Sequence, residues 1–207
     1  MAALAAVGGC TETVSGQGRQ YMAPGSIEAG MVTLDEASAS VHATLTDQTS
    51  QSQPPAAVAA EPESCRVAIG PASASVFTTG WAQYRLTTFQ ETDEVADHSV
   101  TQVVGLYPAD DAAQQAYQAL ADGINACKSA TRKDDGGVET KWAYEVREST
   151  QSALAWTATQ QDTDDWRCYR KAGLKGKALF QVSVCQAGNG APAVDQIADT
   201  VRQRIAG

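Results

Sequence analysis

The residues of this chain that most clearly indicate chemistry are its five cysteines. Cys10 follows the run Val7-Gly8-Gly9 near the start, and the other four are spread along the chain: Cys65, Cys127, Cys168 and Cys185. None belongs to a Cys-x-x-Cys pair, and zinc sites need close ligand pairs and usually histidines, so we expect no metal and no cofactor. Four such cysteines favour two disulfides, which persist in oxidising compartments. The protein is therefore expected outside the cytoplasm.

Cys10 has the setting of a lipid attachment site. The segment Val7-Gly8-Gly9-Cys10 is similar to a bacterial lipobox, in which small residues let a signal peptidase reach the backbone and the cysteine sulfur takes a diacylglycerol. We predict a partial lipoprotein signal over residues 1–10, lipidation at Cys10 and a flexible tether over residues 11–26. Residues 1–9 hold no Lys or Arg and are too few for a full signal peptide, which a start further upstream would explain. The alternative is an N-terminus with an incidental cysteine.

Composition and charge exclude several kinds of partner. The 207 residues suit a single domain with tails, and the formal net charge is -9. Nucleic-acid binding needs basic clusters, so we expect no nucleic-acid partner. The basic cluster of Arg167, Arg170 and Lys171 with Lys175 and Lys177 falls on one predicted hairpin, where a solvated face is favoured over an anion site. No apolar run is long enough for a membrane span, so a membrane would be reached through the N-terminus.

The first part of the chain predicts a short helix followed by an irregular segment. Thr33 and Glu36 have the spacing of a capping box. The apolar residues that follow recur at helical spacing: Leu34, Ala37, Val41 and Leu45. Residues 46–63 are rich in Gln, Ser, Thr, Pro and Ala, and their prolines forbid a helix, so we predict a loop or linker there.

Strand patterns follow Cys65. Residues 77–89 and 99–107 carry the aromatic and β-branched residues typical of strands. Asp110 or Asp111 can cap the helix that comes next. The apolar positions of this helix recur three or four residues apart: Ala113, Tyr117, Leu120, Ile124 and Cys127. Cys127 is therefore expected on its buried face.

The second half of the chain predicts four more strands and a closing helix. The strands cover residues 141–147, 154–160, 166–171 and 177–185, with turns at Asp134-Asp135-Gly136-Gly137 and Gln161-Asp162-Thr163-Asp164-Asp165. The closing helix has apolar positions at Val194, Ile197, Val201 and Ile205. Consecutive strands joined by short turns pair antiparallel. Residues 27–207 are therefore predicted to form one α+β domain, with an antiparallel sheet of about six strands flanked by helices.

The predicted elements suggest how four of the cysteines pair. Cys168 and Cys185 fall on neighbouring predicted strands, where a cross-strand disulfide is geometrically natural. Cys65, at the end of the predicted linker, would then pair with Cys127 on the central helix. Four cysteines allow three pairings, so this assignment is an inference and the others stay open.

The sequence contains no recognisable catalytic motif. His42 falls in the first predicted helix and His98 at a strand start, where a structural or solvated role is favoured over that of a general base. No nucleophile elbow, phosphate-binding glycine loop or His-Glu-x-x-His motif occurs. Asp162, Asp164 and Asp165 lack the glycine and distal glutamate of a calcium loop and fit a solvated turn better. We predict that the protein is not an enzyme.

The order and spacing of several motifs resemble those of the PknH-like extracellular sensor domains, a family that includes the sensor domain of a mycobacterial kinase and stand-alone lipoprotein relatives. The matching motifs are Val32-Thr33-Leu34-Asp35-Glu36, Cys65, Gly80-Trp81, Tyr107-Pro108-Ala109-Asp110-Asp111-Ala112 before the helix that ends at Cys127, Trp166-Arg167-Cys168-Tyr169-Arg170, Val182-Ser183-Val184-Cys185 and the terminal helix. A tryptophan commonly precedes the helical cysteine of the family, whereas Ile124-Asn125-Ala126 stands before Cys127 here.

The resemblance implies an antiparallel sheet flanked by helices, the two disulfides inferred above, and a groove for an unidentified small-molecule, lipid or glycan ligand. We expect five aromatic residues to line the groove, although such residues are more often part of a core: Trp81, Tyr84, Trp142, Tyr144 and Trp156. The expected protein is a monomeric, lipid-anchored, sensor-like lipoprotein of an actinobacterial envelope. The alternatives are a structural or protein-interaction lipoprotein without a small-molecule ligand, and a hydrolase, which would need a histidine or paired carboxylates in a pocket.

Overall fold

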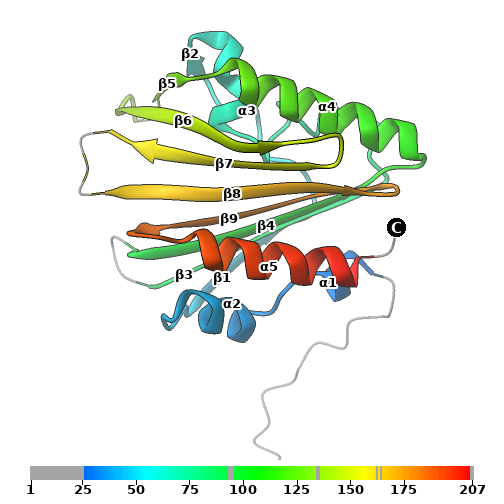
Figure 1. The fold of residues 1–207 in the computed structure, drawn as a ribbon, viewed down its shortest axis with the longest axis horizontal. Coiled ribbons are helices and arrows are strands. Elements are labelled where there is room, and N and C mark those ends of the chain that lie inside the picture. Colours follow the sequence, from blue (N-terminus) through cyan, green and yellow to red (C-terminus); the bar gives the residue numbers. More distant parts are fainter. Residues whose placement is uncertain (1–25, 93–95, 134–135, 162, 164, 206–207) are drawn as a thin grey trace, which may run out of the picture.

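The computed structural model describes residues 26–92, 96–133, 136–161, 163 and 165–205. These residues fold around one antiparallel sheet with the strand order β1-β3-β4-β9-β8-β7-β6-β5-β2 (Figure 1). The strands are β1 (Asp47–Gln51), β2 (Ala60–Glu61), β3 (Gln83–Gln90), β4 (His98–Leu106), β5 (Ser129–Lys133), β6 (Glu139–Ser149), β7 (Ala153–Gln160), β8 (Trp166–Lys175) and β9 (Ala178–Ala187). The pairing of β4 with β9 joins the earlier strands to the later ones at the centre of the sheet.

Helices cover both faces of this sheet. They are α1 (Ile27–Gly30), α2 (Leu34–Val41), the 3-10 turn η1 (Glu63–Cys65), α3 (Arg66–Ile69), α4 (Asp110–Ala126) and α5 (Ala191–Arg204). One face carries η1, α3 and α4, and the other carries α1, α2 and α5 (Figure 1). We call them the α4 face and the α5 face. Each has its own hydrophobic core, which includes Tyr117 and Trp156 on the α4 face and Ile197 and Phe180 on the α5 face.

The alternation of side chains along a strand lets one sheet serve both cores. On β9, Phe180, Val182 and Val184 belong to the core of the α5 face, whereas Leu179 belongs to the core of the α4 face. This central strand is covered on both sides, which explains its nearly continuous apolar sequence. A single layer of strands therefore separates the two sets of helices.

A buried glutamine holds the N-terminal helices on the α5 face. The side chain of Gln102 on β4 is fully buried. It accepts a hydrogen bond from the Val32 N–H at 2.9 Å and donates one to the Val32 carbonyl at 2.7 Å. Val32 lies in the connection between α1 and α2, and buried backbone groups need such partners. The two bonds therefore fix this connection on the sheet.

The capping box predicted at the start of the first long helix is confirmed. Thr33 Oγ1 accepts a hydrogen bond from the Glu36 N–H at 3.3 Å, and the Glu36 carboxylate accepts one from the Thr33 N–H at 2.8 Å. The helix ends at Val41, and His42 follows it in the left-handed conformation rather than inside it. The prediction placed His42 within the helix, so that detail is wrong.

The predicted central helix is also confirmed, with a different first residue. Ala113, Tyr117, Leu120 and Ile124 are buried under α4 as their spacing indicated. The N-cap residue is Ala109, which makes no side-chain cap, so the prediction of an aspartate cap is wrong. Both Asp110 and Asp111 lie in the first turn instead, where the helix dipole stabilises their negative charges.

The sheet has nine strands in the described chain, so the predicted number of about six is wrong. Strands β1 and β2 lie within residues 46–63, the segment predicted as a loop or linker, and β5 precedes the predicted turn at 134–137. β1 is exposed along its whole length at the sheet edge and therefore needs no apolar alternation. β2 has only two residues, and β5 buries only Ala130. Positions 134, 135, 162 and 164 of the two predicted turns lie outside the described residues.

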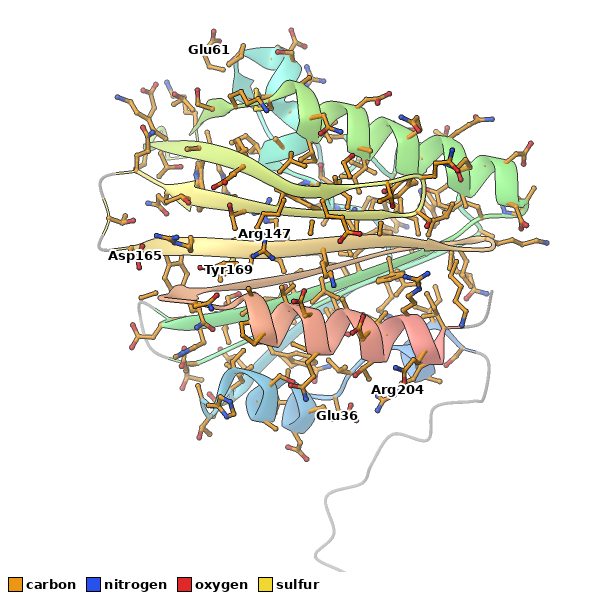
Figure 2. All side chains as sticks on the ribbon, in the orientation of Figure 1. Glu36, Glu61, Arg147, Asp165, Tyr169 and Arg204 are labelled. Carbon is orange, nitrogen blue, oxygen red and sulfur yellow. A yellow bond between two sulfur atoms is a disulfide. The ribbon has the colours of Figure 1, made fainter. Side chains whose placement is uncertain are left out.

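An ion pair joins α5 to α2 at the outside of the α5 face. Arg204, in the last turn of α5, lies beside Glu36 of α2 (Figure 2), with Nη2 2.6 Å from Oε1 and Nη1 3.0 Å from Oε2. The hydrogen bonds from Arg204 and from the Thr33 amide outweigh the effect of burial and lower the pKa of Glu36 to about 2. The ionised carboxylate thus stabilises the folded state.

We expect the Glu36→Gln substitution to lower the free energy of unfolding at neutral pH by less than about 1 kcal/mol, because solvent screens a partly exposed pair. A carboxylate whose pKa is lowered on folding contributes stability above its unfolded pKa of about 4.3, and this contribution is lost as the pH falls through the folded pKa. The difference between wild type and variant should therefore shrink between about pH 5 and pH 2. Urea unfolding across that range measures it, with Glu61→Gln on the exposed strand β2 as the control. An unchanged difference at low pH would contradict the assignment.

Candidate functional site

A cavity of about 230 Å³ lies on the α4 face of the sheet. Its floor is made by four central strands, with Thr101 and Val103 of β4, Trp156 of β7, Arg170 of β8, and Gln181, Val182, Ser183 and Cys185 of β9. Its wall is made by residues 55–73, through Pro55, Val58, Ile69, Gly70, Pro71, Ala72 and Ser73. We call residues 55–73 the wall segment. The lining is mostly apolar, and the volume is somewhat below the range of about 300–1,000 Å³ typical of small-ligand sites.

Three side chains of the sheet hold the wall segment in place through its backbone carbonyls. Gln181 Nε2 on β9 donates to the Pro71 carbonyl at 2.8 Å. The Tyr84 hydroxyl on β3 donates to the Ala72 carbonyl at 2.6 Å, and Arg170 Nη1 on β8 donates to the Ala68 carbonyl at 3.2 Å. Within the wall segment and just beyond it, the Ala74 N–H donates to the Pro55 carbonyl at 2.9 Å. The cavity is therefore bounded by a fixed piece of backbone.

Two disulfides support this arrangement, and they are the pairs inferred from the sequence. Cys65 pairs with Cys127, with 5.2 Å between their Cα atoms, and so ties the wall segment at η1 to the residue that follows α4. Cys168 pairs with Cys185, its direct partner in the β8–β9 register, with 3.9 Å between their Cα atoms. Cys185 itself lines the cavity floor. One bridge therefore restrains the wall of the cavity and the other restrains its floor.

Arg170 brings an unpaired positive charge to the cavity floor. Its Nε is enclosed and has no hydrogen-bond partner among the described atoms, and no described carboxylate forms an ion pair with it. Burial lowers the pKa of Arg170; the Tyr144 phenol opposes this effect, and the nearby cation Arg132 adds to it. An arginine nevertheless stays protonated in proteins. The floor thus holds a partly buried cation, and a second cation, Arg132, lies close enough to affect its pKa.

Trp156 places a second unpaired donor in the same floor. The side chain is fully buried, and its indole Nε1 has no acceptor among the described atoms. Buried indole N–H groups usually find an acceptor. Trp156 and Arg170 are direct partners in the register of β7 and β8, so their side chains are neighbours on the α4 face. Two donors on adjacent strands therefore lack acceptors within the described part of the chain.

Of the five aromatic residues expected to line a groove, Trp156 lines this cavity. The structure brings all five to the core of the α4 face. Tyr84 packs edge-on against Phe77, with ring centroids 5.1 Å apart, and Trp81 lies next to it at 6.1 Å. Trp142 donates to Thr140 Oγ1 at 3.1 Å, and burial raises the pKa of Tyr144 to about 12. These four contribute chiefly to packing around the cavity, and their role as ligand contacts stays a prediction.

Sequence reasoning missed the residues that give the cavity its polarity. It placed Arg170 with Arg167 and Lys171 on one solvated face of a hairpin, and this is wrong for Arg170. Along β8, Arg170 shares the α4 face with the buried Cys168, whereas Lys171 points to the other face and pairs with Asp195 of α5 at 3.0 Å. The twofold period of the strand, counted from Cys168, contained the signal. The wall segment gave no comparable signal, because its apolar residues have no regular spacing.

The described residues that line the cavity include no histidine, aspartate or glutamate. The described part of the chain also holds no group of three or more His, Cys, Asp or Glu side chains arranged to bind a metal ion. His98 is not among the described lining residues, and its Nδ1 contacts the Glu91 carboxylate at 2.8 Å. The polar side chains in the lining are those of Ser73, Thr101, Arg170, Gln181 and Ser183, which can bind a ligand through hydrogen bonds.

Comparison with known proteins identifies the family. The chain matches the model of the PknH-like extracellular domain over residues 22–204. It belongs to the PknH-like extracellular domain family. Among solved structures, the extracellular domain of PknH from Mycobacterium tuberculosis superposes on this PknH-like domain with a TM-score of 0.76 at 20% identity, covering 90% of this chain and 97% of that chain. At that identity the likeness shows a common fold.

Two other comparisons carry no argument about this PknH-like domain. A protein from Mycobacterium smegmatis matches it with a TM-score of 0.33 at 12% identity, covering 76% of this chain and 87% of that chain. No curated protein matches it significantly in sequence. Its described helices are, in addition, all too short or too polar to cross a membrane. The family and the fold therefore rest on the domain model and on the PknH structure.

Proposed function

We propose that this PknH-like domain is a sensor-type module that binds a small ligand of an actinobacterial cell envelope in the α4-face cavity. The observation that carries the proposal is a mostly apolar cavity left unfilled by side chains, whose floor includes Arg170, a cation with no counter-charge among the described residues. Protein interiors are otherwise closely packed and their buried polar groups paired. The wall segment is already fixed by hydrogen bonds and a disulfide, which reduces the entropy lost when a ligand binds.

The proposal includes attachment to the membrane through a diacylglycerol on Cys10. Two facts support it: the run Val7-Gly8-Gly9 precedes this cysteine, and the chain belongs to a family of extracellular domains. Cys10 lies outside the described residues. In an actinobacterial host that expresses the protein, we expect a labelled fatty acid to appear on the wild type and to be lost in Cys10→Ser, with the variant leaving the membrane fraction. Equal labelling of both proteins would overturn the anchor.

Mass spectrometry of compounds extracted from protein purified out of its native envelope tests ligand binding. We expect the wild type to carry a small molecule, and Ser183→Phe to lose it, because the new ring would fill the cavity from its floor. Gln151→Phe adds the same ring in the exposed turn between β6 and β7 and should retain the molecule. A wild type without any bound compound, and with no thermal shift from envelope lipids or glycans, would favour a structural or protein-interaction role instead.

A further inference from the structure

We propose that the ligand of the α4-face cavity is an anionic amphiphile, whose carboxylate or phosphate group pairs with Arg170 while its apolar part contacts the wall segment. This inference rests on the proposed function, since it names the chemical class that the same cavity accepts. Three observations carry it: the charge of the floor, the N–H groups of Arg170 that have no acceptor among the described atoms, and the apolar lining opposite them.

The missing counter-charge of Arg170 is the first observation. The chain has 24 acidic and 15 basic residues, so acids are in excess. Cations on the same strand have partners, since Arg167 pairs with Asp165 and Lys171 pairs with Asp195. Arg170 alone among these three lines the cavity, and the cation Arg132 is close enough to lower its pKa. A partly buried charge without a counter-charge is costly, and an anion from outside the chain would reduce that cost.

The donors on the floor match the oxygens of an anionic group. A planar guanidinium can offer two parallel N–H groups to a carboxylate or a phosphate, and such charge-assisted bonds are stronger than neutral ones. Only Nη1 of Arg170 has a protein acceptor among the described atoms, namely the Ala68 carbonyl. The neighbouring Trp156 N–H also lacks an acceptor among the described atoms, but it is enclosed by protein and does not face the ligand space. An anionic group with two or more oxygens could accept from two N–H groups of the Arg170 guanidinium at once.

The rest of the lining favours an apolar body on the ligand. Pro55, Val58, Ile69 and Val103 line the cavity, and the carbonyls of the wall segment at positions 68, 71 and 72 already accept bonds from the sheet. A sugar would leave many of its hydroxyls without partners in such a lining. The volume of about 230 Å³ fits a short chain rather than a complete membrane lipid. The expected ligand thus has one compact anionic end and one short apolar end.

Isothermal titration of the full chain with four probes of equal chain length tests the inference. The probes are octanoate, octyl phosphate, octanol and octylamine at pH 7.5. We expect at least one anion to bind ten times or more tightly than octanol, and octylamine to bind least. The tighter of the two anions tells whether the head group resembles a carboxylate or a phosphate. Arg170→Gln should remove the advantage of the anions and leave octanol within twofold, whereas Arg170→Lys should keep part of it.

Several results would overturn the inference, and they are distinct from failure of the proposed function. If octanol and the anions bind the wild type equally, the cavity is a binding site without charge selection. If Arg170→Gln weakens octanol as much as the anions, Arg170 acts only by holding the Ala68 carbonyl. If no probe binds, the inference fails, and the compound extracted from the native envelope decides the proposed function independently. Should Arg170→Gln not fold, the wild type and Arg170→Lys still provide the comparison of anions with octanol.

Discussion

Replacing both Cys65 and Cys127 with alanine is expected to lower the free energy of unfolding by about 4 kcal/mol. The bridge closes a loop with a sequence separation of 62, and its loss releases the entropy of that loop in the unfolded chain. Both residues are buried in the core of the α4 face, so alanine avoids burying a new polar group. Urea unfolding under non-reducing conditions measures the change. This is the larger of the two bridge effects that we expect.

The matched control is the double alanine variant of Cys168 and Cys185, whose bridge has a sequence separation of 17. The same relation gives a loss of about 3 kcal/mol for it. A second measurement separates the two variants by location, since only loss of the first bridge frees the wall segment. Hydrogen exchange at residues 66–73 should therefore accelerate in the first variant and change little in the second. The reverse pattern, or a loss below about 1 kcal/mol in the first variant, would contradict the assigned role of the bridge.

Gln102→Leu is expected to lower the free energy of unfolding by about 3 kcal/mol, because each buried backbone group left unpaired costs about 1–3 kcal/mol. The leucine side chain fills a similar volume, but it can neither accept from the Val32 N–H nor donate to the Val32 carbonyl. Both groups would then be buried without partners on the α5 face. Urea unfolding gives the total loss, and hydrogen exchange at residues 31–34 should show that the connection between α1 and α2 opens first.

Gln118→Leu serves as the control for this substitution. Gln118 lies on the exposed side of α4, where its amide donates to Asp122 at 2.8 Å. Its replacement removes one solvated hydrogen bond and should change stability by less than about 0.5 kcal/mol. If Gln102→Leu is equally mild, water reaches Val32 in the variant, and the buried pair is not what holds the N-terminal helices on the sheet.

Much of the fold could be predicted because its determinants are local. The capping box of Thr33 and Glu36 and the three- and four-residue spacing under α4 are each visible within a few residues of chain. The alternation along β6 was equally clear. The pairing of Cys168 with Cys185 followed from placing them on adjacent strands. The edge strand β1 was missed because an exposed strand has no buried face to produce a pattern.

The cavity could not be predicted from the sequence, because the residues that line it are far apart in the chain and form no local pattern. Its floor joins β4 to β7, β8 and β9, and its wall comes from a segment that precedes all of them in the chain. The aromatic residues chosen from the sequence are large enough to form a groove, yet most of them fill the core instead. The residue that matters most for charge, Arg170, is distinguished by having no counter-charge among the described residues, and only a three-dimensional structure shows this.

The position of α1 has a consequence for access to the cavity. Its first helical residue, Ile27, packs into the core of the α5 face, whereas the cavity lies on the other side of the sheet. The first described residues and the cavity therefore lie on opposite sides of the sheet. A partner that made contacts with α1 and α5 would leave the wall segment and the cavity uncovered.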